Sequence, residues 1–239
     1  MRVTAAELID KVAEARLKVS AARYKIEDEV RGTTDKLAAG MRLATAKAKL
    51  RLGDDAKFFA RWIDSPLKTG SVTPSSPALA REMASHVDAG LSGPVIEIGP
   101  GTGPVTEALI AHGIAEERLI LVEFSPEFCL LLRKRFPKAV VIEGDAYGLQ
   151  ATLAGLLPEP AIAVVSSLPL FTRPPPERTA LVEQAFKMMH TGSPFIQFTY
   201  SLVSPVPRKG MNLKTTVSDW VLRNIPPARV WTYRRQTRA

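Results

Sequence analysis

The stretch from Val95 to Gly103 reads VIEIGPGTG. Its first four residues are mostly branched and apolar, which predicts a short buried strand. Three glycines follow at alternate positions and predict a tight loop whose backbone can approach a ligand closely. Pro104 then stands where a helix takes its first residue, and we expect that helix to end at about His112. A strand that runs through a glycine-rich loop into a helix is typical of nucleotide-cofactor sites.

The sequence around this unit predicts a parallel sheet. Short apolar runs occupy residues 119–123, 140–142, 161–165 and 195–200, and a helix is expected at Glu177–His190. Apolar strands that alternate with helices are typical of a parallel sheet covered on both faces. We therefore predict an α/β fold with helices on both faces of the sheet.

Composition sets the size of the core and the class of partner. The chain has 239 residues, 46% of them hydrophobic, which is enough for one sizeable core and an extension. We expect no secretory signal and no transmembrane helix. Cys129 is the only cysteine, which excludes an intramolecular disulfide and favours the cytosol. The net charge of +8 favours a polyanionic partner, either nucleic acid or an anionic membrane surface.

Residues 1–56 are predicted to form a helical extension. Thr4 to Glu7 fits a capping box, and an apolar stripe then recurs at spacings of three and four residues: Leu8, Val12, Ala15, Val19, Ala22 and Ile26. Lysines and arginines flank both borders of this stripe, as in helices that lie in a membrane interface. We interpret the extension as a membrane-docking segment. Packing on the main domain, dimerisation and nucleic-acid contact are the alternatives.

The glycine loop does not fit a dinucleotide. A dinucleotide fingerprint has a third glycine where Pro104 stands, and Glu97 would place negative charge beside phosphates. S-adenosylmethionine fits better, because it carries an ammonium and a sulfonium and no phosphate. Glu123, which ends the next strand, is placed to accept bonds from the ribose hydroxyls, and Asp145 of the Gly144-Asp145-Ala146 stretch can accept the adenine amino group.

At these residues the chain resembles the class I S-adenosylmethionine-dependent methyltransferases. The resemblance implies a Rossmann-like, seven-stranded, mostly parallel sheet in a domain at residues 57–239. It also implies a terminal hairpin of Val217–Arg223 and Arg229–Arg235, joined by Asn224–Pro227. The cofactor site then comprises Val72, Glu97, Gly99, Pro100, Gly101, Thr102, Gly103, Glu123, Phe124, Gly144, Asp145, Ala146 and Ser166. S-adenosylhomocysteine would be the product, and we expect no metal.

The fourth predicted strand ends in Ser166–Phe171, which reads SSLPLF. The rRNA adenine dimethyltransferases carry Asn-Leu-Pro-Tyr or a close variant here, and the aromatic ring stacks on the flipped base. In this chain Ser167 replaces the asparagine and Leu170 replaces the aromatic residue. An acceptor nitrogen is therefore expected, but a nucleobase is not.

A second resemblance covers most of the chain. The SSLPLF stretch, QFTYSLVSPVP at 197–207 and RNIPPARVW at 223–231 are similar to the bacterial phospholipid N-methyltransferases. The resemblance implies methylation of phosphatidylethanolamine and its mono- and dimethyl forms towards phosphatidylcholine. It also implies peripheral attachment to the inner face of the plasma membrane. The catalytic residues are then predicted to be Ser167, Leu168, Pro169 and Tyr200.

Two other functions are compatible with the sequence. An RNA or DNA amino-methyltransferase would explain the basic termini, although Leu170 argues against it. A protein that binds the cofactor and membranes without catalysis is the third hypothesis. His86, His112 and His190 are expected in or beside helices, as satisfied or exposed side chains.

Overall fold

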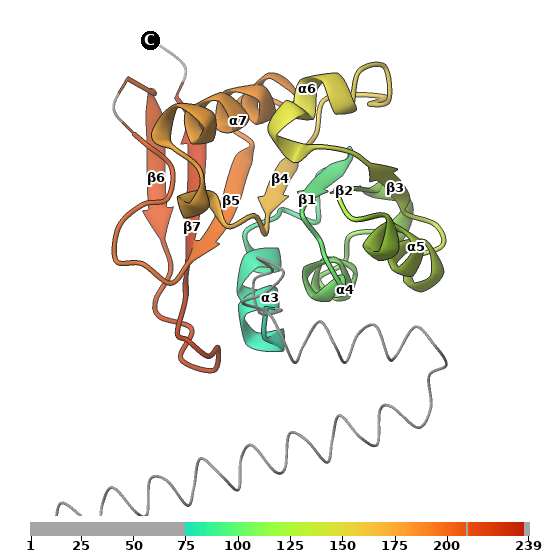
Figure 1. The fold of residues 1–239 in the computed structure, drawn as a ribbon, viewed down its shortest axis with the longest axis horizontal. Helices are drawn as coiled ribbons and strands as arrows, with labels where there is room; N and C mark the ends of the chain where they lie inside the picture. Colours follow the sequence, from blue (N-terminus) through green and yellow to red (C-terminus); the bar gives the residue numbers. More distant parts are fainter. Residues whose placement is uncertain (1–74, 209, 237–239) are drawn as a thin grey trace, which may run out of the picture. The chain divides into compact units, whose positions relative to one another are not determined.

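A computed structural model of the chain describes residues 75–208 and 210–236. Seven strands form one sheet in the order β3-β2-β1-β4-β5-β7-β6 (Figure 1). Strand β7 runs antiparallel to both of its neighbours, β5 and β6, and all other pairs are parallel. The predicted seven-stranded, mostly parallel sheet is thus confirmed. The strands are β1 Val95–Ile98, β2 Leu119–Glu123, β3 Val140–Glu143, β4 Ala163–Ser166, β5 Pro194–Thr199, β6 Leu213–Val217 and β7 Arg229–Arg235.

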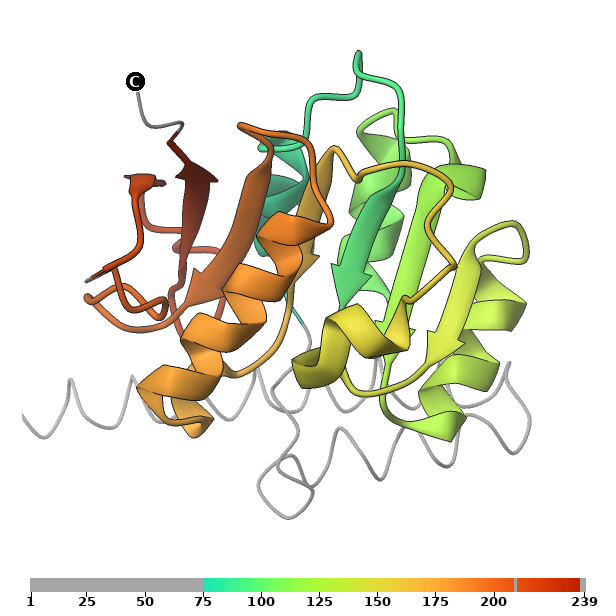
Figure 2. The same cartoon turned by 90° about the horizontal axis from the view of Figure 1, so that it is seen from above.

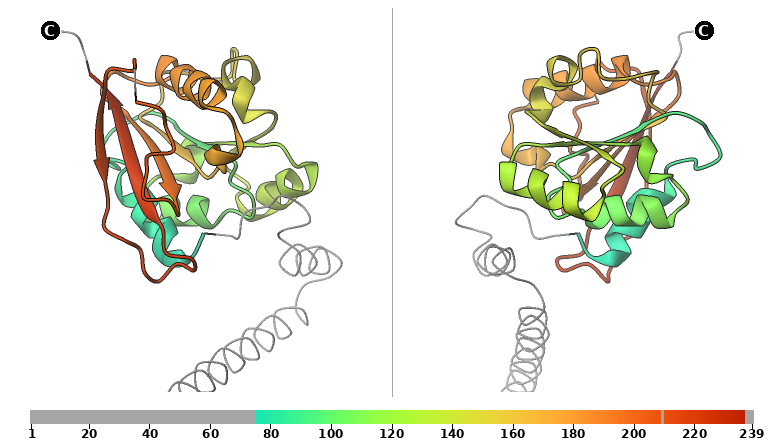
Figure 3. Two further views of the ribbon diagram at one scale, coloured as in Figure 1. Left: turned by 60° about the vertical axis from the view of Figure 1, so that its left-hand side comes forward. Right: turned by 90° about the vertical axis from the view of Figure 1, so that its right-hand side faces the viewer.

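Helices cover both faces of the sheet, as predicted. Helices α3, α4 and α5 lie on one face, and α6 and α7 lie on the other (Figures 1 and 2). The same layers are visible edge-on in Figure 3. Several helices begin with proline in the first turn after a serine, glycine or proline cap. Their bounds are α3 Pro77–Ser85, α4 Pro104–Ala111, α5 Pro126–Arg135, α6 Leu149–Thr152 and α7 Pro175–Lys187, with short 3₁₀ turns at Glu116–Arg118, Ala146–Gly148 and Leu170–Thr172.

The central strands are buried along their whole length. Every residue of β1, β2, β4 and β5 is inaccessible to solvent or nearly so, whereas β3 at the edge of the sheet is exposed at both ends. The core of one face includes Ile96, Ile98, Val164, Phe195 and Tyr233. This burial of both faces accounts for the continuous apolar runs in the sequence.

The terminal hairpin differs from its prediction. The penultimate strand was expected at Val217–Arg223, but β6 occupies Leu213–Val217 and pairs with β7 from Leu213–Arg235 to Val217–Trp231. Residues 218–228 form the connection instead. The strand was missed because β6 reads LKTTV, with three successive polar residues and no buried position, so that it lacks the apolar run of the inner strands.

The register places one set of residues at the carboxyl edge of the sheet. Ile98 lies beside Val122 on one side and Ser166 on the other, and Ser166 lies beside Gln197. Loops that follow β1, β2, β4 and β5 therefore meet at this edge, where open α/β sheets bind ligands.

Several predictions concern residues outside the described ranges. The helical extension at 1–56 and Val72 belong to this group. Within residues 75–208 and 210–236, no helix has the length and apolarity needed to cross a bilayer.

Candidate functional site

The glycine loop after β1 is shaped by close contacts on both sides. Gly99 has φ +67°, and a Cβ there would lie 2.7 Å from Cδ2 of Leu168. Gly103 has φ +86°, and a Cβ there would lie 2.5 Å from the Phe136 ring. These positions need glycine both for backbone conformation and for space. A Cβ at Gly101 would meet no atom within 4 Å, so the middle of the loop borders open space.

Pro100 and Thr102 support the loop from within. Both residues are buried, and the Pro100 carbonyl accepts the Gly103 N–H at 2.9 Å. The Thr102 carbonyl accepts a hydrogen bond from the Arg135 guanidinium of α5. The loop is therefore fixed on its inner side, while its Gly101 backbone remains accessible.

Glu97 holds a fully buried carboxyl group beside the loop. Its Oε2 accepts a hydrogen bond from the Thr106 hydroxyl in the first turn of α4 at 2.7 Å, and its Oε1 has no partner among the described residues. Burial raises the pKa of Glu97 to about 8; the Thr106 hydrogen bond opposes this shift, and the charge of Glu123 adds to it. A cationic ligand group would supply the missing partner of Oε1.

Glu123 joins the loop to the end of β2. Its Oε2 accepts the Gly101 N–H and its Oε1 accepts the Ser125 N–H, each at 2.9 Å. Two backbone donors hold the carboxylate in one orientation, and each oxygen retains a lone pair for a further bond. The geometry agrees with the predicted role of an acid that receives ribose hydroxyls.

The residues predicted around the adenine lie next to Glu123. The Gly144 N–H donates to the Glu123 carbonyl at 2.9 Å, and the Asp145 carboxylate accepts the Tyr147 N–H at 2.9 Å. Ala146 is buried, whereas the Phe124 side chain is 77% exposed. An exposed ring next to an anchored acid provides an apolar face and a hydrogen-bond acceptor for a flat heterocycle.

The SSLPLF stretch begins inside β4 and leaves the sheet beside the glycine loop. Ser166 is fully buried and its hydroxyl accepts the Leu168 N–H at 3.4 Å. The Ser167 N–H donates to the Ile98 carbonyl at 3.0 Å, and the Ser167 hydroxyl is buried without a partner among the described residues. Leu168 is half-buried and Pro169 is exposed. Backbone bonds thus hold this stretch within reach of the cofactor loop.

Gln197 was not predicted as a site residue. It lies in β5, is 1% exposed, and donates through Nε2 to the Leu168 carbonyl at 3.0 Å and to the Phe198 carbonyl at 2.8 Å. Its Oε1 is buried and has no partner among the described residues. The available signal was an amide side chain in the middle of the otherwise largely apolar strand PFIQFT.

Tyr200 follows β5 and is half-buried. Burial raises the pKa of its phenol, although a hydrogen bond with Asn224 acts in the opposite direction. A phenol with a raised pKa stays protonated at neutral pH, so Tyr200 can orient a group but cannot serve as an ionised base. Asn224 is itself 2% exposed and accepts the Ser76 N–H at 3.0 Å.

Leu170 and Phe171 end the stretch in different environments. Leu170 is 2% exposed and packs in the core, so its side chain offers no face to a ligand. Phe171 is 47% exposed, and the Arg178 guanidinium lies 5.1 Å from the centre of its ring. The position that carries an aromatic residue in the rRNA adenine dimethyltransferases is therefore a core position here.

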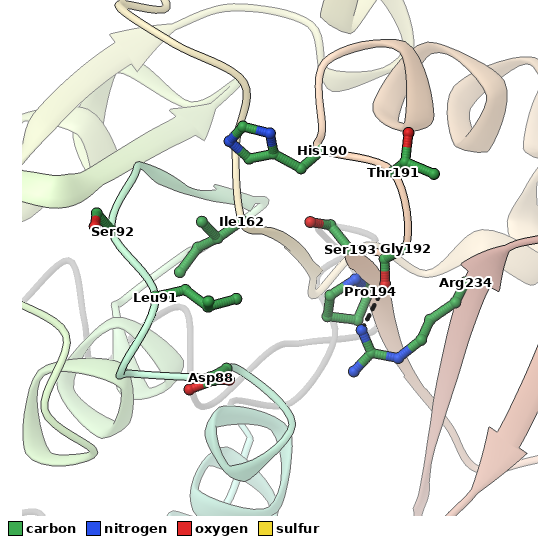
Figure 4. Close-up of a pocket in the computed structure, with 10 residues that line it drawn as sticks. All are labelled: Asp88, Leu91, Ser92, Ile162, His190, Thr191, Gly192, Ser193, Pro194 and Arg234. Carbon is green, nitrogen blue, oxygen red and sulfur yellow. Dashed lines mark hydrogen bonds between the residues drawn. The ribbon is translucent and has the colours of Figure 1, made fainter.

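A cavity of about 500 Å³ lies at the opposite, amino edge of the sheet (Figure 4). His190, Asp88 and Arg234 line it, and the Arg234 guanidinium donates to the Gly192 carbonyl at 2.7 Å. None of the predicted site residues lines this cavity. His86 lies 3.4 Å from the Glu82 carboxylate, and the His112 ring bonds the Val87 carbonyl, so these histidines have structural partners.

The residues at the carboxyl edge fit S-adenosylmethionine. The Glu97 oxygen that has no partner in the described part of the chain suits an ammonium, the anchored Glu123 suits a ribose, and the Gly101 backbone faces open space. Val72, also predicted here, lies outside the described residues.

Comparison with known proteins supports this interpretation. No family model matches the chain. The ornithine lipid N-methyltransferase of Singulisphaera acidiphila is 30% identical over 145 residues, which span 59% of this chain and 76% of that protein. The ribosomal RNA small subunit methyltransferase A of a Synechococcus species is 40% identical over 75 residues, which span 30% of this chain and 24% of that protein.

Solved methyltransferase structures share the fold. A SAM-dependent O-methyltransferase from Thermotoga maritima has a TM-score of 0.52 at 14% identity over 74% of this chain and 72% of its own. An O-methyltransferase from Bacillus cereus in complex with SAH has a TM-score of 0.52 at 13% identity over 81% of this chain and 91% of its own. S-adenosylmethionine is thus the cofactor, as predicted. The chain belongs to the class I S-adenosylmethionine-dependent methyltransferases, in the family that includes the ornithine lipid N-methyltransferase of Singulisphaera acidiphila.

Proposed function

We propose that this chain methylates the primary amine of a membrane-lipid headgroup, with phosphatidylethanolamine as its first substrate and phosphatidylcholine as the end of the series. The observation that carries the proposal is the match to the ornithine lipid N-methyltransferase. It covers 76% of that protein, whose name describes N-methylation of an amine-bearing lipid. Ethanolamine and ornithine headgroups both present an amine on a short methylene chain, so the ornithine lipid is the second candidate.

The acceptor edge offers oxygens to an amine. The Ser167 hydroxyl, which is buried and has no partner within residues 75–208 and 210–236, lies next to the cofactor loop together with the Leu168 carbonyl, whose direction Gln197 fixes. An amine has N–H donors for both oxygens, which would aim its lone pair away from them. Bound S-adenosylmethionine supplies an electrophilic methyl group. The amine must lose a proton to water before its lone pair can form the new bond to carbon.

The burial of Leu170 supports a lipid over a nucleobase. A base-modifying enzyme stacks its flipped base on an exposed aromatic or apolar side chain, whereas Leu170 is 2% exposed. The match to ribosomal RNA methyltransferases also spans only 24% of those proteins. It covers too little of them to carry their substrate over to this chain.

A competition assay tests the proposal. The full chain would be incubated with methyl-labelled S-adenosylmethionine, phosphatidylethanolamine vesicles, ornithine-lipid vesicles and total RNA, and the products separated by phase and by chromatography. We expect label in phosphatidylethanolamine and its methylated forms. Label in the ornithine lipid alone would replace the proposed substrate, and label in RNA alone would overturn the lipid proposal.

A matched pair of serine variants locates the acceptor edge. Ser167→Ala should slow transfer to lipid, because one of the two proposed amine acceptors is lost. Ser92→Ala, an exposed position that lines the cavity at the opposite edge, should leave transfer unchanged. Equal rates for both variants would remove Ser167 from the proposed acceptor site.

A further inference from the structure

Five large apolar side chains stand exposed in the loops around the acceptor edge. Together they form what we call the apolar rim. Their exposed fractions are 47% for Phe171, 75% for Leu202, 60% for Val203, 73% for Leu222 and 86% for Ile225. None of the five is needed to fill the core. Clusters of this kind on a protein surface mark an interaction site, whereas single exposed apolar residues do not.

The rim is built from three segments that meet at one edge of the sheet. Thr199 at the end of β5 pairs with Arg229 at the start of β7, so the connection 218–228 leaves the sheet where β5 ends. Tyr200 bonds Asn224 across these two segments. Arg178 connects the third segment, which carries Phe171, to the loop after β5. Its guanidinium lies over the Phe171 ring and donates to the Pro205 carbonyl at 2.7 Å.

The rim projects beyond the ends of the strands. The β6–β7 connection extends past the carboxyl edge of the sheet (Figures 1 and 3). Its tip carries Leu222 and Ile225, and Asn224 between them is buried and fixed by its bonds to Ser76 and Pro226. A structured turn that holds its apolar side chains outward can insert them into a membrane interface without first having to order the chain.

Exposed arginines lie next to the apolar side chains of the rim in the sequence. Arg223 is exposed between Leu222 and Asn224, and Arg173, two residues after Phe171, is exposed while it also pairs with Glu177 at 3.5 Å. Long cationic side chains beside protruding apolar groups match the interface of a bilayer, where the apolar groups reach the acyl chains and the guanidinium groups meet anionic headgroups. The net charge of +8 favours the same partner.

We propose that the apolar rim inserts into the interfacial layer of an anionic phospholipid bilayer and turns the acceptor edge towards the headgroups. This inference rests on the proposed lipid substrate and adds the surface by which the enzyme reaches it. A headgroup amine then enters beside Ser167 while its acyl chains stay in the bilayer. The rim is distinct from the predicted docking segment at residues 1–56.

Site-specific fluorescence tests the contact directly. Cys129 is fully buried, so Ile225→Cys and Leu130→Cys can each be labelled with a polarity-sensitive dye. Leu130 is 60% exposed on α5 and is the matched control. With vesicles of phosphatidylcholine and phosphatidylglycerol, we expect a blue shift at position 225 and none at 130. Vesicle binding without a shift at position 225, or no vesicle binding at all, would overturn the proposed insertion of the apolar rim.

Activity on two forms of the substrate separates this inference from the proposed function. Leu222→Asp combined with Ile225→Asp should lower methyl transfer to vesicle phosphatidylethanolamine about tenfold or more, while transfer to soluble dihexanoyl phosphatidylethanolamine stays within about twofold. Leu130→Asp with Leu156→Asp, also exposed, should change neither rate. An equal loss of methyl transfer to both substrates, or no loss with either, would contradict membrane insertion of the apolar rim. A wild-type chain that methylates neither lipid counts against the proposed function.

Discussion

Glu97 is a buried acid whose second oxygen has no partner among the described residues, and its ionisation should therefore be coupled to the cofactor. Because its pKa is raised to about 8, the free protein holds this group mostly protonated at pH 7. An ammonium prefers the carboxylate, so cofactor binding should release a proton there and become tighter as pH rises from 6 to 8. Calorimetry in two buffers of different ionisation enthalpy measures the proton release. Glu97→Gln should remove this release, and an unchanged value would refute the assignment.

The same carboxyl group should affect stability in the absence of cofactor. A raised pKa means that the folded state binds a proton more tightly than the unfolded chain between pH 4.5 and 8. The wild type therefore loses stability as pH rises through this range, by up to about 1.4 kcal/mol per pH unit. Glu97→Gln mimics the protonated group, so its advantage in the free energy of unfolding should grow from pH 5 to 8 and then level off. Urea titrations at several pH values test this, and parallel pH profiles would contradict it.

Gln197 should act as a positioning residue for the acceptor. Gln197→Met keeps the volume and removes the donor to the Leu168 carbonyl. We expect kcat for lipid methylation to fall about tenfold to a hundredfold with little change in cofactor affinity, since misplacement of the acceptor carbonyl affects alignment. Thr232→Val is the control, because Thr232 lies in the neighbouring strand β7, pairs with Ile196 rather than with Gln197, and has a buried hydroxyl without a partner among the described residues. If both variants lower kcat equally, the effect of Gln197 is structural.

At the scale of elements, the Asn224 side chain ties the β6–β7 connection to the segment ahead of α3. Asn224 accepts the Ser76 N–H ahead of α3 and donates to the Pro226 carbonyl at 2.7 Å. Asn224→Ala would leave buried polar groups unpaired, and we expect a loss of about 2–3 kcal/mol in the free energy of unfolding. Denaturant titration measures this loss. Arg223→Ala, at the exposed neighbouring position, should cost much less, and equal losses would show that Asn224 does not anchor the turn.

How far each element could be predicted follows from its burial. The inner strands β1, β2, β4 and β5 are apolar because both faces are covered, and each lies within two residues of its predicted place. The edge strand β6 is missed because its exposure requires polar residues. The turn after it is joined to the start of the domain by a bond between Asn224 and Ser76, which are 148 positions apart. No local pattern encodes such a contact.

In the candidate site, too, the residues marked by a local pattern were predicted and the one that depends on strand pairing was not. Glu97, Glu123 and Asp145 were singled out because each lies in or just after one of the first three strands, where the ammonium, ribose and adenine of the cofactor are expected to need an acid. Gln197 was missed because its role depends on the register that sets it beside Ser166. Parallel pairing of distant segments is a property of the assembled sheet, so a residue that acts across two strands becomes visible only in the fold.

At the scale of the whole molecule, cofactor binding is expected to be independent of the predicted N-terminal docking segment. Every described site residue lies between Glu97 and Tyr200, and the described core is drawn from residues 79–233. The predicted docking segment at 1–56 includes a basic stretch from Lys36 to Leu52 without an acid. We therefore predict that residues 57–239 fold cooperatively and bind S-adenosylmethionine with a Kd within about twofold of the full chain.

Removal of residues 1–56 should then lower methyl transfer to vesicles but not to soluble dihexanoyl phosphatidylethanolamine. The apolar rim would still orient the enzyme, but it would act without the electrostatic attraction of the basic segment, and vesicle binding should weaken. Co-sedimentation with vesicles and transfer assays on both substrates measure this separation. A shortened chain that loses cofactor binding would show that the domain begins before residue 57. One that methylates vesicles at the full rate would assign docking to the rim alone.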